Sequence, residues 1–451
     1  MRASMTFAQV TGPQAIAGEY IVKFKKTAGV GGGLRAVGKL GSSIAVKTVF
    51  AGSSMMHVKV SSEAAKNALL SNPDVDFVEP NYILSVNPTD VSGLGSAPAP
   101  TDDYSQSSAN VQVKQSWTIQ KPADQGNKVI VAVVDTGLDM QHGLFADSNA
   151  IWTNQAELNG QPGVDDDNNG YIDDIHGWNF AANSANNSDD NDHGTHCAGI
   201  ILGVGQDVLA NPVRESKVRI MPLKFLDSTG AGSTASAVSA IIYAVKNGAK
   251  VISNSWGGSS YSQSLHEAYT YAYSNGVVIA SAAGNSNSDN DSVDMYPANL
   301  DTPNNISVAA TDDNDNRASF SNFGATKVSV AAPGVRILSS VPGQGCLAPG
   351  CFMMMSGTSM ATPFVAGMAA LIFREAPQLS SYQVKSLILG SVDVVAGLSG
   401  KVSSGGRVNV YKAITSAINS SSTAAWAPNY DPNYKASRSP ASETTGAAAP
   451  A

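Results

Sequence analysis

The chain has 451 residues, 43% of them hydrophobic and 14% charged, so it can bury a large core. A formal charge of −8 disfavours nucleic acid or an anionic membrane surface as the main partner. With 3 cysteines the chain is not a disulfide-rich scaffold, and no apolar run reaches the roughly 18 residues of a membrane span.

The N-terminal part, residues 18–86, is predicted to form a small α+β unit. Gly18–Phe24 alternates apolar and polar residues, as a half-buried strand does. Residues 61–70 are typical of a helix, and Val75–Leu84 of a second strand.

Three other segments carry weaker signals. Residues 1–17 contain a sequence similar to a signal-peptide cleavage site, but polar residues interrupt the apolar region. We interpret them as an N-terminal segment that is either the remnant of an export signal or unrelated to one. Residues 87–108 are rich in Pro, Gly and Ser, which indicates an exposed, cleavable linker. Residues 421–451 indicate a low-complexity C-terminal tail.

The central part, residues 109–420, alternates apolar runs with helical segments. Val129–Val134 is apolar at every position, which favours a parallel strand buried on both faces. Further strands are predicted at 218–226, 251–253, 277–280, 306–310 and 328–331, and helices at 234–247 and 264–274. This alternation predicts an α/β fold with a doubly wound parallel sheet, whose chemistry collects at the carboxyl ends of the strands.

Three residues in this part are candidates for catalysis. Asp135 follows the buried run 129–134, His193 opens an apolar segment of small residues, and Ser359 opens another. A serine hydroxyl at a helix N-terminus lies where unpaired N–H groups favour negative charge. Taken alone, each residue has a structural alternative: a turn Asp, a core His and a helix-capping Ser. His193 and His196 also lack the spacing of a zinc-binding His-Glu-x-x-His motif.

Together, the segments DTGLD, HGTHCAG and GTSMATP, in the order Asp, His, Ser, resemble the signature segments of subtilisin-like serine proteases. The resemblance implies a serine endopeptidase that acts on proteins or peptides. Ser359 would attack the peptide carbonyl, His193 would accept its proton, and Asp135 would orient His193. Asn285, which ends VIASAAGN, would bind the oxyanion together with the Ser359 backbone N–H.

The same resemblance implies where substrate binds. Ser255, Trp256, Gly257 and Gly258 would pair with an extended peptide and form one wall of the primary pocket. The residues Ala282, Ala283 and Gly284 would form the facing wall. Because these walls are small and uncharged, we expect an apolar or aromatic residue before the scissile bond.

Residues 18–86 resemble the inhibitory propeptides of this family, and an unrelated small domain is the alternative. As a propeptide, the unit would be an intramolecular inhibitor, removed by cleavage within 87–108. The resemblance implies a secreted protein, extracellular or periplasmic. Two other interpretations remain: a catalytically silent binding protein on the same fold, and a calcium-stiffened interaction protein.

Calcium is predicted at an acidic loop that matches the first half of an EF-hand. The expected ligands are Asp165, Asp167, Asn169, the Tyr171 carbonyl and Asp174. Because His176 stands at the twelfth position, the motif is incomplete, and a solvated acidic turn is the alternative. Residues 189–192 form a second, weaker acidic candidate.

The cysteines support one further prediction. Cys346 and Cys351 flank Leu347-Ala348-Pro349-Gly350, a turn that brings two sulfurs together, so we predict a disulfide between them. Cys197 is predicted to be a buried, unpaired thiol.

Overall fold

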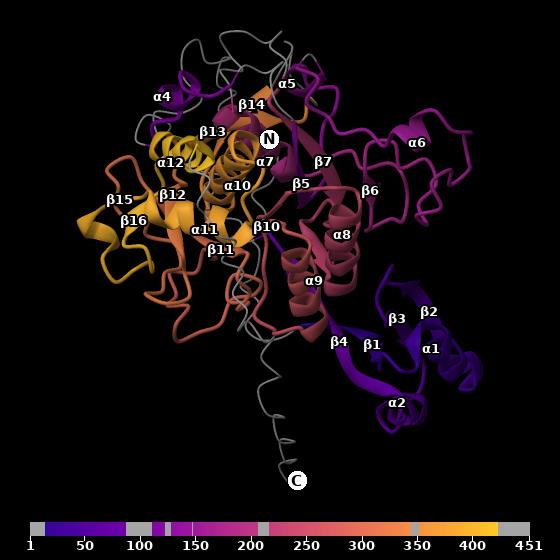
Figure 1. Ribbon diagram of the computed structural model, residues 1–451. Helices are drawn as coiled ribbons and strands as arrows, with labels where there is room; N and C mark the ends of the chain where they lie inside the picture. The colour runs from indigo at the N-terminus through magenta and orange to yellow at the C-terminus, as the bar shows by residue number, and fades with distance from the viewer. Residues whose placement is uncertain are drawn as a thin grey trace, which may run out of the picture.

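The computed structural model describes residues 14–86, 111–121, 128–146, 148–205, 216–343 and 351–422 (Figure 1). Within these residues the centre is a nine-stranded sheet of order β15-β16-β12-β11-β10-β9-β5-β7-β6. The strands are β5 (Val129–Asp135), β6 (Trp178–Asn179), β7 (Val218–Lys224), β9 (Val251–Asn254), β10 (Val278–Ala282), β11 (Asn305–Thr311), β12 (Val330–Pro333), β15 (Asp393–Val394) and β16 (Gly406–Arg407). Neighbouring strands run parallel except for β15 and β16. The predicted doubly wound parallel sheet is confirmed.

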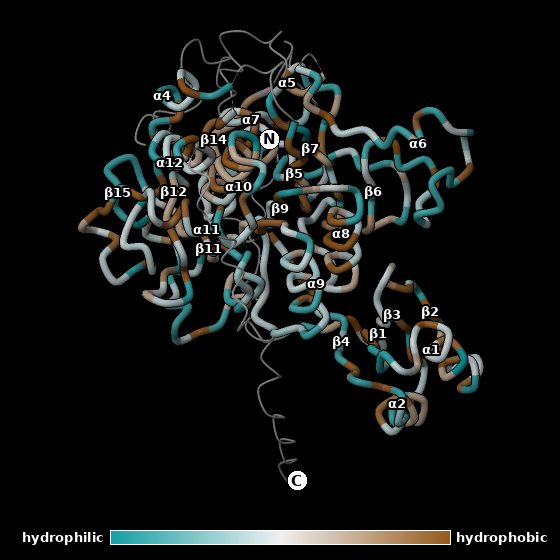
Figure 2. Tube along the Cα trace, viewed as in Figure 1, coloured by the Kyte–Doolittle hydropathy of each residue, from teal (hydrophilic) through white to brown (hydrophobic). Residues whose placement is uncertain are grey.

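Helices bury both faces of this sheet. Val131 and Val133 join the apolar core on the side of α7, α10, α11 and α12, whereas Ala132 and Val134 join the core on the side of α8 and α9. These helices are α7 (His193–Gly205), α8 (Thr234–Lys246), α9 (Gln263–Ser274), α10 (Thr358–Glu375), α11 (Ser381–Gly390) and α12 (Val410–Ser422). Figure 2 shows hydrophobic stretches along α8, α10 and β7. Burial on both faces explains why the predicted strands are apolar at successive positions.

The predicted ends of α8 and α9 follow from their capping residues. Ser233 and Ser262 are the N-caps, each accepting a backbone hydrogen bond through its side chain. Each helix ends before an Asn-Gly pair, where Gly248 and Gly276 adopt positive φ angles of 81° and 72°. Glycine takes this conformation without the steric cost of a Cβ atom, so it terminates the helix.

The N-terminal unit is a second, smaller structure beside this body (Figure 1, indigo). It contains β1 (Ala15–Phe24), α1 (Gly29–Gly38), a 3₁₀ turn (Gly41–Ser43), β2 (Ile44–Val49), β3 (Met55–Val60), α2 (Glu63–Leu70) and β4 (Val75–Ser85). Its sheet has the order β2-β3-β1-β4-β8, in which β8 (Ala231–Ser233) comes from the body. One sheet therefore spans both parts of the chain.

Shorter elements complete the body. They are α4 (Val113–Trp117), α5 (Gly143–Ala146), α6 (Gln155–Leu158), the pair β13 (Ile337–Val341) and β14 (Cys351–Met355), and a 3₁₀ turn (Ala396–Leu398). In the part of the chain that the structure describes, no helix is both long and apolar enough to cross a bilayer. The predicted linker 87–108 and residues 423–451 of the predicted tail lie outside the described residues, so the domain limits stay predictions.

Candidate active site

The predicted site residues lie at the carboxyl edge of the central sheet. Asp135 ends β5, Ser255 follows β9, and Asn285 comes shortly after β10. Strand β5 lies between β7 and β9. After β5 the chain forms β7 on one side of it, and then β9 on the other side. In open α/β sheets, ligands bind outside the carboxyl ends of strands at such a reversal.

Asp135 and His193 form the polar centre of this edge. The His193 Nδ1 atom lies 2.8 Å from Asp135 Oδ1, and the backbone N–H of Thr136 donates to the same oxygen at 2.7 Å. Burial lowers the pKa of His193, but the Asp135 carboxylate outweighs it and raises that pKa well above 6.5. The carboxylate therefore holds the Nδ1 proton, and Nε2 is the ring atom that can act as a base.

Ser359 lies in the first turn of α10, next to the same edge. Its hydroxyl donates to the carbonyl oxygen of Ser255 at 3.1 Å, and the Ser255 hydroxyl donates to the Ser359 carbonyl at 3.0 Å. To transfer a proton to His193, the Ser359 hydroxyl has to turn away from Ser255. Looser hydrogen bonds are common in enzymes without substrate.

Thr358 holds the side chain of Asn285. Both its backbone N–H and its hydroxyl donate to Asn285 Oδ1, at 2.8 and 2.9 Å. Because the amide oxygen accepts these bonds, Nδ2 is the atom of Asn285 that can donate to an oxyanion.

In the first predicted substrate wall, the backbone and the side chains have different contacts. Gly257 makes two backbone hydrogen bonds with Ser85 of the N-terminal unit, with N–O distances of 2.9 and 3.0 Å. The Trp256 indole instead lies in the core, where Nε1 donates to the Val134 carbonyl at 2.8 Å. Trp256 therefore contributes its backbone to this wall, while its ring anchors the wall to β5.

The facing wall is apolar and tightly packed. Ala282 and Ala283 are buried, and Gly284 has a φ angle of 108°. A Cβ atom on Gly284 would come 2.5 Å from Nδ2 of Asn322, so only glycine fits here.

The predicted calcium loop brings three carboxylates together. Asp165, Asp167 and Glu157 present oxygens that all lie within 4.8 Å of one another. Glu157 was not predicted. It also accepts backbone N–H bonds from Asp166 and Asp173, at 2.8 and 2.9 Å, which fold the loop around it. Hard carboxylate oxygens are the ligands that Ca²⁺ prefers, so this donor set fits the ion.

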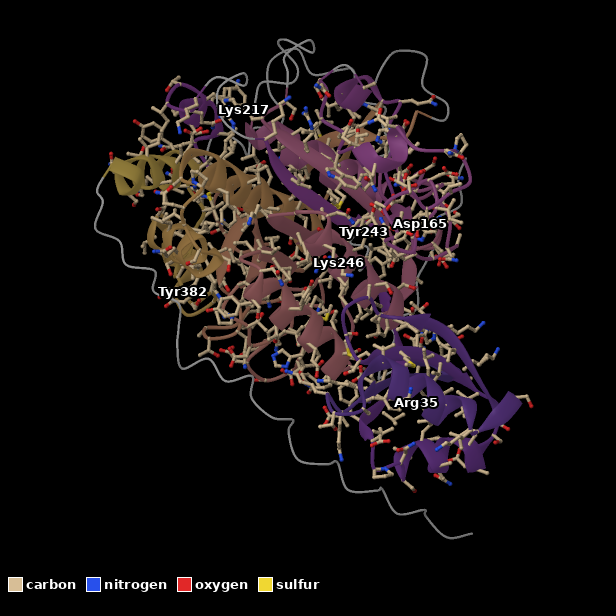
Figure 3. All side chains as sticks on the ribbon, turned by 45° about the vertical axis from the view of Figure 1, so that its right-hand side comes forward. Arg35, Asp165, Lys217, Tyr243, Lys246 and Tyr382 are labelled. Carbon is tan, nitrogen blue, oxygen red and sulfur yellow. The ribbon has the colours of Figure 1, made fainter. Side chains whose placement is uncertain are left out.

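Asn169, Tyr171 and Asp174 are the other predicted ligands, and they make separate contacts. Asp174 Oδ2 accepts hydrogen bonds from Asn169 Nδ2 at 2.9 Å and from the Tyr243 hydroxyl at 2.5 Å. The Tyr171 ring packs edge-on against Trp178, Phe180 and Tyr243. Burial raises the pKa of Asp174. Figure 3 labels Asp165 on the loop and Tyr243 on α8. Asp174 thus links the loop to α8 through hydrogen bonds, whereas the carboxylate of Glu157 lies close to those of Asp165 and Asp167.

A lysine contacts the second acidic cluster. Lys224 Nζ lies 2.6 Å from Asp190 Oδ1 and donates to the Thr136 carbonyl at 2.6 Å. Asp189 accepts hydrogen bonds from the Thr136 and Thr195 hydroxyls at 2.8 and 2.6 Å. Whether calcium binds at this cluster stays a prediction.

The sequence contains only weak indications of the contacts made by Glu157 and Lys224. Glu157 lies eight positions before Asp165, outside the EF-hand spacing, so only its place in a short polar helix pointed to the loop. Lys224 ends an apolar strand, and a lysine at such a position needs an acidic partner.

The three cysteines gave one confirmed prediction. Cys197 is a free, fully buried thiol whose sulfur lies 3.9 Å from His193 Nδ1. The predicted disulfide joins Cys346 and Cys351. Cys346 lies outside the described residues, and of Cys351 only the backbone is described. That disulfide stays a prediction.

A doubly wound sheet with an aspartate, a histidine and a serine at its carboxyl edge is the arrangement of a serine hydrolase. Residues 126–417 match the model of the subtilase family, and the chain belongs to this family. It is a serine endopeptidase, which acts on protein or peptide substrates.

Curated relatives support the same conclusion. The thermophilic serine proteinase of Bacillus sp. (strain AK1) is 32% identical over 403 residues, which cover 89% of this chain and 88% of that protein. Thermitase of Thermoactinomyces vulgaris is 34% identical over 319 residues, or 70% of this chain and 99% of thermitase. Subtilisin DY of Bacillus licheniformis is 40% identical over 213 residues, or 47% of this chain and 74% of that subtilisin.

Proposed function

We propose that Asp135, His193 and Ser359 are the catalytic triad of this endopeptidase, with Asn285 as an oxyanion donor. The observation that carries the proposal is the 2.8 Å contact between His193 Nδ1 and Asp135 Oδ1, beside a serine in the first turn of α10.

In this mechanism His193 Nε2 accepts the hydroxyl proton of Ser359 while the oxygen attacks the peptide carbonyl. Asp135 stabilises the imidazolium that forms. The oxyanion of the tetrahedral intermediate receives hydrogen bonds from Asn285 Nδ2 and the Ser359 backbone N–H. His193 then gives the proton to the leaving amine, the C–N bond breaks, and water hydrolyses the acyl-enzyme by the same steps.

The test replaces Ser359 by Ala and follows casein hydrolysis and labelling by a fluorophosphonate probe. We expect kcat to fall by about 10⁶-fold and labelling to vanish, a magnitude known from a subtilisin. Ser403→Ala is the matched control, because its hydroxyl bonds to the Ser329 carbonyl, away from the site. Full activity in Ser359→Ala, or an unmutated chain that neither cleaves nor labels after residues 18–86 are removed, would contradict the proposal.

We also propose that residues 18–86 are an inhibitory prosegment. The end of β4 supports this role, because it lies between two edges of the body like a substrate strand. Leu84 pairs with Gly232 on one side, while Ser85 pairs with Ala231 on that side and with Gly257 on the other. An extended chain held by backbone bonds on both sides occupies the groove that a peptide substrate needs.

Side chains of the same strand contact two helices of the body. Glu79 accepts backbone N–H bonds from Gln263 and Ser264 at the start of α9, at 2.7 and 3.0 Å. Asn81 Oδ1 accepts from the Ala235 N–H at the start of α8, at 2.9 Å. These donors are among those that a helix leaves unpaired at its N-terminus, and a carboxylate is favoured there.

We also propose that the chain is a zymogen that processes itself, which can be tested by following chain length. The unmodified protein is expected to yield a shorter chain that begins within residues 87–108, whereas Ser359→Ala stays full length. N-terminal sequencing identifies the bond. A Ser359→Ala chain that is shortened in the same way would assign the cut to another protease.

We further propose that Ca²⁺ binds between Glu157, Asp165 and Asp167, and that the protein is exported. The three-carboxylate arrangement supports the ion, since the loop around it is already folded by Glu157. When bound, Ca²⁺ would offset two of the three negative charges and link Glu157 of α6 to the acidic loop.

A further inference from the structure

Asn322 contacts the chain on both sides of Asn285. Its backbone N–H donates to the Gly284 carbonyl at 2.8 Å, one residue before Asn285. Its side-chain Oδ1 accepts from the N–H groups of Ser286 and Ser288, at 2.9 and 3.0 Å. One residue from a different loop thus fixes the backbone that carries Asn285.

Asn322 is itself held in one orientation. It is 3% exposed, and its Nδ2 donates to Asn290 Oδ1 at 3.0 Å. Asn290 in turn donates through its own Nδ2 to the Ala283 carbonyl at 3.0 Å. Because each amide donates through nitrogen and accepts through oxygen, neither can flip without breaking this chain of bonds.

The contact is also close in space. Gly284 has a φ of 108°, and a Cβ there would lie 2.5 Å from Asn322 Nδ2. The backbone of the loop therefore packs directly on the Asn322 amide, with no side chain between them.

We propose that Asn322 is a positioning residue for the oxyanion donor. Thr358 holds the Asn285 side chain by its oxygen, and Asn322 holds the backbone from which that side chain extends. The inference rests on the proposed role of Asn285. An oxyanion donor works because it is already aimed when charge develops, and a displacement of about 1 Å can reduce the rate by about 100-fold.

The test is a double-mutant cycle with Asn285→Ala, Asn322→Ala and both together, measured by kcat and KM on a peptide substrate. We expect Asn285→Ala to lower kcat by about 100- to 1000-fold. Asn322→Ala is expected to lower kcat about tenfold with KM within about twofold. In the Asn285→Ala background, Asn322→Ala is expected to change kcat by less than about twofold, because the donor that it positions is gone.

Asn304→Ala is the matched control. Asn304 is equally buried, and its Nδ2 donates to the Val277 carbonyl at 2.8 Å, away from the oxyanion loop. It should lower the melting temperature as Asn322→Ala does but leave kcat unchanged.

Two results would overturn the inference: a tenfold loss that persists in the Asn285→Ala background, or an equal loss of kcat in Asn304→Ala. If Asn322→Ala does not fold, Asn290→Ala enters the same cycle, with a smaller loss of kcat that again disappears without Asn285. An Asn285→Ala chain with full kcat would instead refute the proposed function of Asn285.

Discussion

The body and its junction with the N-terminal unit both contain buried apolar residues, but the junction adds specific polar contacts. Inside the body, both faces of the central sheet pack against buried apolar helices. At the junction, Ile21, Phe50, Met55 and Leu84 of the N-terminal unit join the apolar cluster of α8 and α9. Backbone pairs of Ser85 and the capping bonds of Glu79 and Asn81 add directional contacts there. Apolar burial stabilises in proportion to area, whereas hydrogen bonds depend on geometry and can be exchanged with water. The N-terminal unit therefore contributes to the core on the α8 and α9 side, whereas the core on the α7 and α10 side contains none of its described residues.

The first prediction concerns the body itself. Asp135→Asn replaces the carboxylate that holds His193 Nδ1 with an amide. We expect kcat of the chain without its prosegment to fall by about 10⁴-fold, because the imidazole is held in the wrong tautomer. The control is Asp139→Asn, whose carboxylate accepts from the Gln141 and Gly343 N–H groups and not from His193. Equal kcat values for the two variants would contradict the role given to Asp135.

The second prediction weakens the junction alone. Glu79→Ala removes the acceptor of four donors from Ser262, Gln263 and Ser264. Hydrogen bonds to a charged group contribute about 1.5–3 kcal/mol, which corresponds to roughly 10- to 100-fold in affinity. We expect the uncut chain to react with a fluorophosphonate faster by that factor, with the kcat of the processed enzyme unchanged.

Glu63→Ala is the control for Glu79, because Glu63 lies on the exposed side of the same unit and pairs only locally with Lys66. Identical labelling rates for Glu79→Ala and Glu63→Ala would show that the capping contacts do not hold the prosegment in place.

The third prediction concerns pH. The raised pKa of His193 means that its neutral, basic form predominates only above that value. We expect kcat/KM of the processed enzyme to fall about tenfold per pH unit on the acid side, with the midpoint above pH 6.5. The stability from the His193–Asp135 pair changes in the opposite sense: it is present below pH 6.5 and is lost as pH rises through the raised pKa. A midpoint at or below pH 6.5 would contradict this coupling.

The smallest expected effect is at the acidic loop. Calcium at about 100 times its dissociation constant would add about 2.7 kcal/mol of stability, or roughly 3–4 °C in Tm for a chain of this size. Asp165→Asn should remove most of this gain, and Asp313→Asn, whose partner is Arg336, should keep it. The measurement is a melting curve of the Ser359→Ala chain in calcium and in EGTA. Coincident curves would exclude the proposed site.

Sequence motifs predict the proposed site residues because each motif contains both the residue and the backbone that places it. Asp135 ends an apolar strand, and Ser359 begins an apolar helix, so their positions follow from local pattern. Glu157, Lys224 and Asn322 could not be found in this way. Each reaches its partners from a different element, and only the folded chain brings a lysine at the end of β7 to the acidic residues before His193. Glu79 was missed for the same reason, since the helix that it caps lies 184 residues further along.

Lys224 gives the loop before His193 a cation that is part of the polypeptide. A chelator cannot remove this charge, and its amount does not vary with the ionic composition of the medium. If Ca²⁺ binds beside Asp165 as proposed, its loss would loosen that loop first, while His193 would keep its electrostatic surroundings. In a calcium-poor environment the enzyme should survive for a shorter time, but each surviving molecule should turn over substrate at its full rate.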